Sequence, residues 1–207
     1  TGRNGPPAGD RVNAVAPLDR LADRVREEGP PLAVREEAVT GTIPAIFGEL
    51  AAAGPRTGGN GTEYAFVVEA VREGYLCHYG SSRILDQPDA DLALLAGDLF
   101  YAIGIRGLAG LDDLESTGIL SDLIRVAAEL QADGRADSAE VLWLGQIVAL
   151  SCGKDDAQRE AVEALEAGRE GAEAALLDWS KRSAATNGLG RAFDIVQTAI
   201  DSRPSNF

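Results

Sequence analysis

Two polar residues interrupt apolar helical patterns and are the first candidates for chemistry. In residues 91–108, apolar side chains recur at steps of three and four, the spacing of a buried helix. Gly97 and Asp98 lie inside that run, where a glycine lowers helix propensity and a carboxylate meets apolar neighbours. The pattern predicts either a close helix crossing at Gly97, with Asp98 hydrogen-bonded to a neighbouring helix, or a functional site.

His78 is the only histidine of the chain and continues an apolar stripe that begins at Tyr64. It is interpreted either as a polar group in an internal cavity or as a hydrogen-bonded core residue or helix-end cation. A single histidine offers no ligand cluster, and Cys77 and Cys152 show no metal-binding spacing, so we predict no metal site. Both cysteines lie in apolar helical sequence, where free thiols behave as small hydrophobic groups, which indicates a reducing cytosol.

Several aspartates stand where a helix begins. Residues 111–116, LDDLES, lie between a glycine and the next apolar run, a place that predicts helix capping rather than a metal motif. We expect Asp155 or Asp156 to cap the helix that follows residue 153 in the same way, and Asp89 or Asp91 to begin the helix around Asp98.

Length and charge restrict the class of protein. A chain of 207 residues that is 45% hydrophobic and 25% charged predicts one globular domain. The formal net charge of −14 argues against nucleic acid or an anionic membrane surface as the main partner. No run reaches the roughly 18–20 uninterrupted apolar residues of a membrane span, and no signal peptide is recognised. We expect no membrane span, a cytoplasmic location, a flexible leader at 1–10 and a single helical domain at 11–207.

The periodicities predict an all-α bundle of seven or eight helices without strands. Residues 136–152 are apolar on nearly all sides, so this segment is expected to be central or to lie in an interface. The expected helical regions are 12–28, 32–53 with interruptions at Gly41 and Pro44, 62–78, 89–107 ended by Gly107 and Gly110, 119–131, 136–152, 157–186 and 190–201.

Two segments resemble a known family. Residues 94–102, LLAGDLFYA, look like the "LAGD" helix of the trans-polyprenyl diphosphate synthases, and 188–201, GLGRAFDIVQTAID, is similar to the second aspartate-rich helix of that family. The resemblance implies the all-helical isoprenoid-synthase fold. It also implies truncation at the C-terminus, because active members continue with further helices beyond the position of Phe207.

The chain departs from the family where the family binds its substrate. Active members place converging carboxylates around Mg²⁺ ions that hold a diphosphate. Here the second motif keeps only Asp201, and residues 75–82 contain no aspartate where the first motif is expected. The Gly-Lys-x-x-Arg-Pro segment of active members is also missing. The departures imply no catalytic residues and no cofactor.

Three functions follow from the resemblance. The first is a pseudoenzyme similar to the non-catalytic small component of two-component synthases, which would pair through helices with a catalytic polyprenyl diphosphate synthase and line a hydrophobic chain tunnel. The second is a divergent Mg²⁺-dependent prenyltransferase or terpene synthase that uses Asp98, Asp194 and Asp201. The third is a protein that binds an apolar lipid or isoprenoid ligand. A homodimer is also expected. The candidate cavity-lining residues are Tyr75, His78, Tyr79, Asp98, Tyr101 and Asp194.

Overall fold

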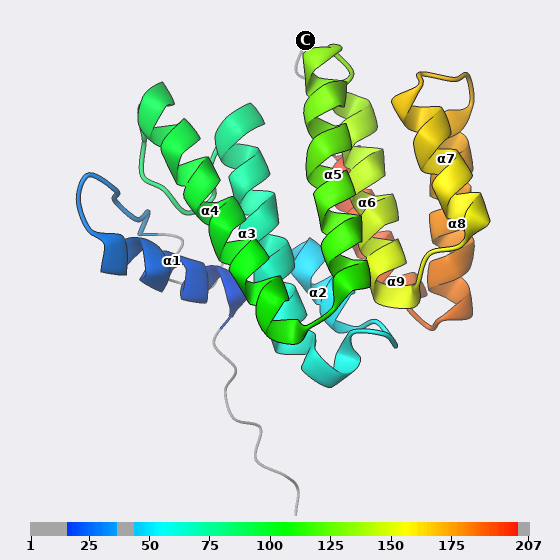
Figure 1. Cartoon of the computed structure of the whole chain (residues 1–207), viewed down its shortest axis with the longest axis horizontal. Helices are drawn as coiled ribbons and strands as arrows, with labels where there is room; N and C mark the ends of the chain where they lie inside the picture. Colours follow the sequence, from blue (N-terminus) through cyan, green and yellow to red (C-terminus); the bar gives the residue numbers. More distant parts are fainter. Residues whose placement is uncertain (1–15, 37–43, 203–207) are drawn as a thin grey trace, which may run out of the picture.

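The structure is a computed structural model that describes residues 16–36 and 44–202 (Figure 1). Within these ranges every regular element is a helix, apart from one isolated β-bridge. This confirms the all-α class. Within those ranges there are nine α-helices, one or two more than expected, and one short 3₁₀ helix. The elements are α1 (Pro17–Glu28), α2 (Ile46–Ala52), η2 (Gly58–Asn60), α3 (Gly61–Tyr79), α4 (Ala90–Leu111), α5 (Leu114–Ala132), α6 (Ala136–Cys152), α7 (Asp156–Glu166), α8 (Ala172–Thr186) and α9 (Gly190–Asp201).

Helix α6 forms the centre of the larger core. It contacts α2, α5, α7, α8 and α9, and the side chains of Leu142, Trp143 and Ile147 are fully buried. Its apolar residues face partners on nearly every side, which is the condition under which a helix without a polar face is stable in a soluble domain. The prediction that residues 136–152 are central is confirmed.

Helix α3 separates this core from a smaller one. Val67 and Val71 belong to the larger cluster, whereas Phe66 and Ala70 belong to a second cluster shared with α1, α4 and the segment that leads into α4. Helix α3 is therefore buried on several sides from Tyr64 to Tyr75. Figure 1 shows α3 and α4 side by side, with α1 at one end of the molecule and α7 and α8 at the other.

Two expected helical regions differ from the structure. The described part of 32–53 is helical only in α2, and Val34 instead forms an isolated antiparallel β-bridge with Leu85. Gly41 and the leader 1–10 lie outside the described residues. The expected helix 157–186 is two helices, because Gly168 and Gly171 adopt left-handed backbone conformations that end α7 and begin α8.

Helix α4 is longer than expected at its C-terminal end. It continues through Gly107 and Gly110 to Leu111. The next residue, Asp112, has a left-handed backbone conformation that ends the helix. Gly107 permits a close helix approach instead of ending the helix: a Cβ there would lie 2.6 Å from Cγ2 of Val67 on α3. The helix begins directly after Asp89, one of the two expected start positions, and the Asp89 side chain accepts a hydrogen bond from the Leu92 N–H.

The predicted capping residues at the starts of α5 and α7 are confirmed. Asp113 caps α5 by accepting from the Ser116 N–H at 3.0 Å. Asp155 caps α7 by accepting from the Gln158 N–H at 2.9 Å, and it also accepts from Nε1 of Trp179 on α8 at 3.0 Å. Asn60 occupies the cap position of α3 but makes no side-chain capping hydrogen bond.

Candidate functional site

Five of the six candidate residues from the sequence meet where the end of α3 lies against α4. Tyr75, His78 and Tyr79 come from α3, and Asp98 and Tyr101 come from α4. The rings of His78 and Tyr101 stack with centroids 5.4 Å apart and planes 13° apart, and the rings of Tyr75 and Tyr79 lie 5.3 Å apart. We call these five residues the aromatic cluster.

The close crossing expected at Gly97 is present. A Cβ at Gly97 would lie 2.6 Å from Cδ2 of His78, so only glycine lets the two helices approach this far. Asp98 Oδ1 lies 3.2 Å from His78 Nε2, but the contact lacks hydrogen-bond geometry. Since 73% of the Asp98 side chain is exposed, water screens this contact, and it attracts only when the imidazole is protonated.

The two tyrosines nearest the core have structural partners. Tyr75 is buried, its ring centroid lies 5.6 Å from that of Trp143, and its hydroxyl accepts a hydrogen bond from Gln131 Nε2 at 2.6 Å. Burial, together with the neighbouring Tyr79 and Tyr75 hydroxyls, raises the pKa of Tyr101 above its usual value. The Tyr101 phenol therefore remains protonated at neutral pH and is not poised as a base.

His78 also lines a pocket of about 440 Å³ at the start of α4. Its other walls include Arg35, Ser82 and Gln87, which give it a mixed polar and apolar lining. Cys77 reaches the same pocket, but burial raises the pKa of its thiol to about 12. The thiol is protonated at neutral pH and is a poor nucleophile.

Asp194 lies apart from the aromatic cluster. It is exposed on α9, where it borders a shallow hollow with Arg191, Ile195 and Thr198. Within residues 16–36 and 44–202, no three His, Cys, Asp or Glu side chains lie close enough together to hold a metal ion. The carboxylates of Asp98, Asp194 and Asp201 are thus not gathered into one group.

The sequence analysis did not predict a network of buried charged residues that joins α3 to the segment before α4. Glu73 is fully buried and accepts hydrogen bonds from Ser82 Oγ at 2.6 Å, from the Arg83 N–H at 2.7 Å and from Arg83 Nε at 2.9 Å. Arg83 Nη2 also lies 2.8 Å from Oε2 of Glu69, another fully buried carboxylate. Burial alone would lower the pKa of Arg83, but the two carboxylates raise it, so the guanidinium stays charged.

A second part of this network joins α3 to α6. The guanidinium of Arg72 donates to both carboxylate oxygens of Glu140, at 2.7 and 2.8 Å. It also lies 4.8 Å from the ring centroid of Trp143. The signal in the sequence was three charges at 69, 72 and 73 inside an otherwise apolar run, which only buried partners can compensate.

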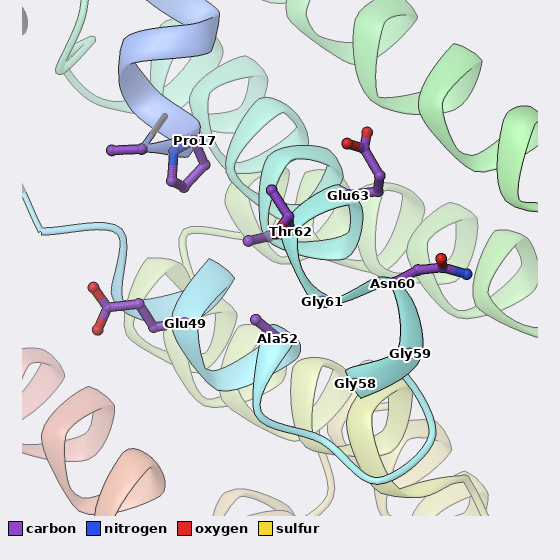
Figure 2. Close-up of a pocket in the computed structure, with 11 residues that line it drawn as sticks. Pro17, Glu49, Ala52, Gly58, Gly59, Asn60, Gly61, Thr62 and Glu63 are labelled. Atoms are coloured by element: carbon purple, nitrogen blue, oxygen red, sulfur yellow. The ribbon is translucent and has the colours of Figure 1, made fainter. Parts of the chain in front are cut away.

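A pocket of about 620 Å³ lies between the first residue of α1, α2 and the glycine-rich turn before α3 (Figure 2). Backbone of Gly58 and Gly61 lines it, which is the kind of turn that holds phosphates at a helix start. Glu49 and Glu63 line the same pocket and give it negative charge, and Figure 2 shows their side chains well apart and pointing in different directions. The arrangement suits neither a phosphate nor a metal ion.

Helix α4 exposes several large apolar side chains to solvent. Leu95 is 68%, Ile105 53% and Leu94 46% exposed. In length and composition α4 could cross a membrane. The fold buries only 28% of its most apolar 18-residue window. The absence of a membrane span stays a prediction. The α4 outer face is defined here as Leu94, Leu95, Asp98, Leu99, Ala102, Ile105, Arg106, Ala109 and Gly110.

No family model, no curated protein and no solved structure matches this chain in the comparisons. The likeness to polyprenyl diphosphate synthases therefore rests on residues 94–102 and 188–201 alone. The first of these segments lies in α4 and the second forms the start and body of α9.

Proposed function

We propose that this chain is a non-catalytic, isoprenoid-synthase-like subunit that assembles with other protein chains through the α4 outer face. The resemblance makes a catalytic polyprenyl diphosphate synthase the partner to test first. In such a complex the apolar side chains of this face would also help to line the chain tunnel.

The exposure of the α4 outer face carries this proposal. Soluble monomers rarely expose contiguous apolar surface of this kind, and where they do it commonly marks an interaction site. Leu94 and Leu95 are separated from Ile105 by about three turns of the same helix, so one elongated partner could cover them together. Because these side chains are already partly buried, covering each of them would contribute about 1–2 kcal/mol.

The placement of the acidic residues favours a non-catalytic role. Diphosphate chemistry of the resembled family requires several carboxylate oxygens that converge on Mg²⁺. Asp98 lies against His78, whereas Asp194 and Asp201 lie on α9, and none of the three belongs to a group of ligating side chains. The buried carboxylates of Glu69 and Glu73 both lie against the guanidinium of Arg83 instead of facing a pocket.

The test is capture from a lysate of the source cell with the tagged full chain as bait. Wild-type protein should recover a synthase that carries an Asp-Asp-x-x-Asp motif, and Ile105→Glu should recover at least about tenfold less, because it places a charge in the apolar contact. Ile195→Glu is the matched control, since Ile195 is 45% exposed on α9 and lies off this face.

Two results would overturn the proposal. One is recovery of no such synthase, or equal recovery with all three baits. The other is turnover by the purified chain alone in the presence of Mg²⁺, isopentenyl diphosphate and an allylic diphosphate.

A further inference from the structure

We propose that the pocket between α5, α6 and α7 binds a free α-amino acid whose side chain ends in a primary carboxamide. The pocket has a volume of about 160 Å³, the space of about five water molecules in the liquid, so its occupant is a small molecule. Ile119 and Val162 give it an apolar wall against which methylene groups can pack. No residue of α4 lines this pocket, so the inference goes beyond the proposed function and does not depend on it.

Two buried glutamine side chains line the pocket. Gln146 on α6 and Gln158 on α7 are each only 3% exposed. Gln158 Nε2 donates a hydrogen bond to Gln146 Oε1 at 3.0 Å, which joins the two helices. Burying an amide costs free energy unless its donors and acceptors are used, so two such groups beside a cavity indicate a polar occupant.

The amide pair leaves one donor and one acceptor free. Among the described residues, neither Gln146 Nε2 nor Gln158 Oε1 has a hydrogen-bond partner. A primary carboxamide complements this pair, because its carbonyl can accept from Gln146 and its NH₂ group can donate to Gln158. A carboxylate only accepts, so in the same position it would leave the oxygen of Gln158 unpaired.

Three exposed charged side chains of the pocket can hold the other end of such a ligand. Lys154 lies in the turn between α6 and α7, Asp122 lies on α5, and Glu163 lies on α7. None of the three makes an ion pair in the part of the chain that the structure describes. The α-carboxylate of a free amino acid can accept from Lys154, and its α-ammonium group can donate to Asp122 or Glu163.

The remaining charges of the pocket favour this zwitterion over a simple anion. Arg125 lies 2.7 Å from Glu166, and Arg159 is paired with Asp156, so both guanidinium groups already have a carboxylate partner. An anion without an amine would gain Lys154 and also meet two unpaired carboxylates. An amine without a carboxylate would leave Lys154 unused. An α-amino acid carries both charges on one carbon atom.

The first test titrates the purified full chain with L-glutamine and L-asparagine by calorimetry. At least one of them should bind saturably with a dissociation constant below about 1 mM. L-glutamate and L-aspartate should bind at least about tenfold more weakly, because they lack the N–H donor. Butyramide, which keeps the carboxamide and lacks the zwitterion, should also bind at least about tenfold more weakly.

The second test changes the protein. Lys154→Ala should weaken binding of the preferred amino acid at least about tenfold. Lys181→Ala is the matched control, because Lys181 is the other lysine of the chain and is exposed on α8 away from the pocket. Gln158→Met keeps a side chain of similar length, removes the amide and should weaken binding to a similar extent. If Gln158→Met loses helical circular dichroism, Lys154→Ala still decides.

Three results would overturn the inference. The first is no saturable binding of either carboxamide amino acid up to about 10 mM. The second is equal binding of an amide and its acid, such as glutamine and glutamate. The third is equal binding by Lys154→Ala and Lys181→Ala. None of these results changes the capture of a synthase through the α4 outer face, so the two proposals can fail separately.

Discussion

Helices α6 and α4 are both apolar on most of their sides, yet Leu142 on α6 is fully buried whereas Leu95 on α4 is 68% exposed. The difference comes from the neighbours: α6 has helices around it, whereas α4 has one long contact, with α3, and a short one with α5. An apolar helix surface favours contact with other apolar surfaces. The helices that pack around it decide whether the fold itself covers it.

The largest expected effect tests this difference with one substitution on each helix. Leu142→Ala should lower the free energy of unfolding by about 3 kcal/mol, because it opens a cavity in the core. Leu95→Ala should change it by less than about 0.5 kcal/mol, because the side chain already contacts water. Urea denaturation of the two purified variants measures both values.

Similar losses from the two leucine substitutions would contradict the comparison. They would mean that α4 is covered within the single chain and that its outer face is not free.

The next largest effect on the free energy of unfolding is expected at the junction between α4 and α5. Asp113, where α4 passes into α5, accepts from Arg56 at 2.8 Å and from the Tyr64 hydroxyl at 2.6 Å. Burial alone would raise the pKa of Asp113, but the hydrogen bonds from Tyr64 and Ser116 and the charge of Arg56 hold it well below the usual 3.8. Asp113→Asn should lower the free energy of unfolding at pH 7 by about 2 kcal/mol.

The pH dependence of that loss has a definite sign. Because the pKa is depressed in the folded state, the carboxylate stabilises the fold above pH 3.8 and loses this effect as the pH falls below it. The gap between wild type and Asp113→Asn should therefore shrink by about 1 kcal/mol per pH unit below that point. Denaturation at pH 7, 5 and 3 measures it, with the exposed Asp133→Asn as a control. A gap that stays constant to pH 3 would contradict the assignment.

The smallest effect tests how tightly α4 is held on its covered side. A Cβ at Gly104 would lie 2.7 Å from Cγ2 of the fully buried Val71, so Gly104→Ala should destabilise the fold by about 1 kcal/mol despite its better helix propensity. Gly118→Ala in α5, with no atom within 4 Å of the added Cβ, should instead stabilise by up to about 1 kcal/mol. Thermal unfolding of the two variants measures the difference. A stabilising Gly104→Ala would show that α4 packs loosely on α3.

The sequence predicted the elements better than their surroundings. The period of apolar residues placed α5, α6 and α9, and the caps at Asp113 and Asp155 followed from local chemistry. The break between α7 and α8 was missed because Gly168 and Gly171 carry no side-chain pattern, and only their backbone conformations reveal it.

Long-range pairing explains what the sequence left out. Glu140 is 68 residues from Arg72, and no local rule connects them. The grouping of five candidate residues followed from helix periodicity, because Tyr75, His78 and Tyr79 share one side of α3. The exposure of α4 did not follow, since an apolar helix reads the same whether or not another helix covers it.

The two tryptophans are separate fluorescent reporters for the centre and for one edge of the larger core. Trp143 is fully buried among aromatic rings, and its indole N–H has no acceptor within the described ranges, whereas the indole of Trp179 is bonded to Asp155 where α7 begins. A chain with Trp179→Phe thus emits from its centre alone, and one with Trp143→Phe emits from the α7–α8 edge. Comparing their fluorescence during refolding would reveal whether centre and edge assemble in one step or in succession.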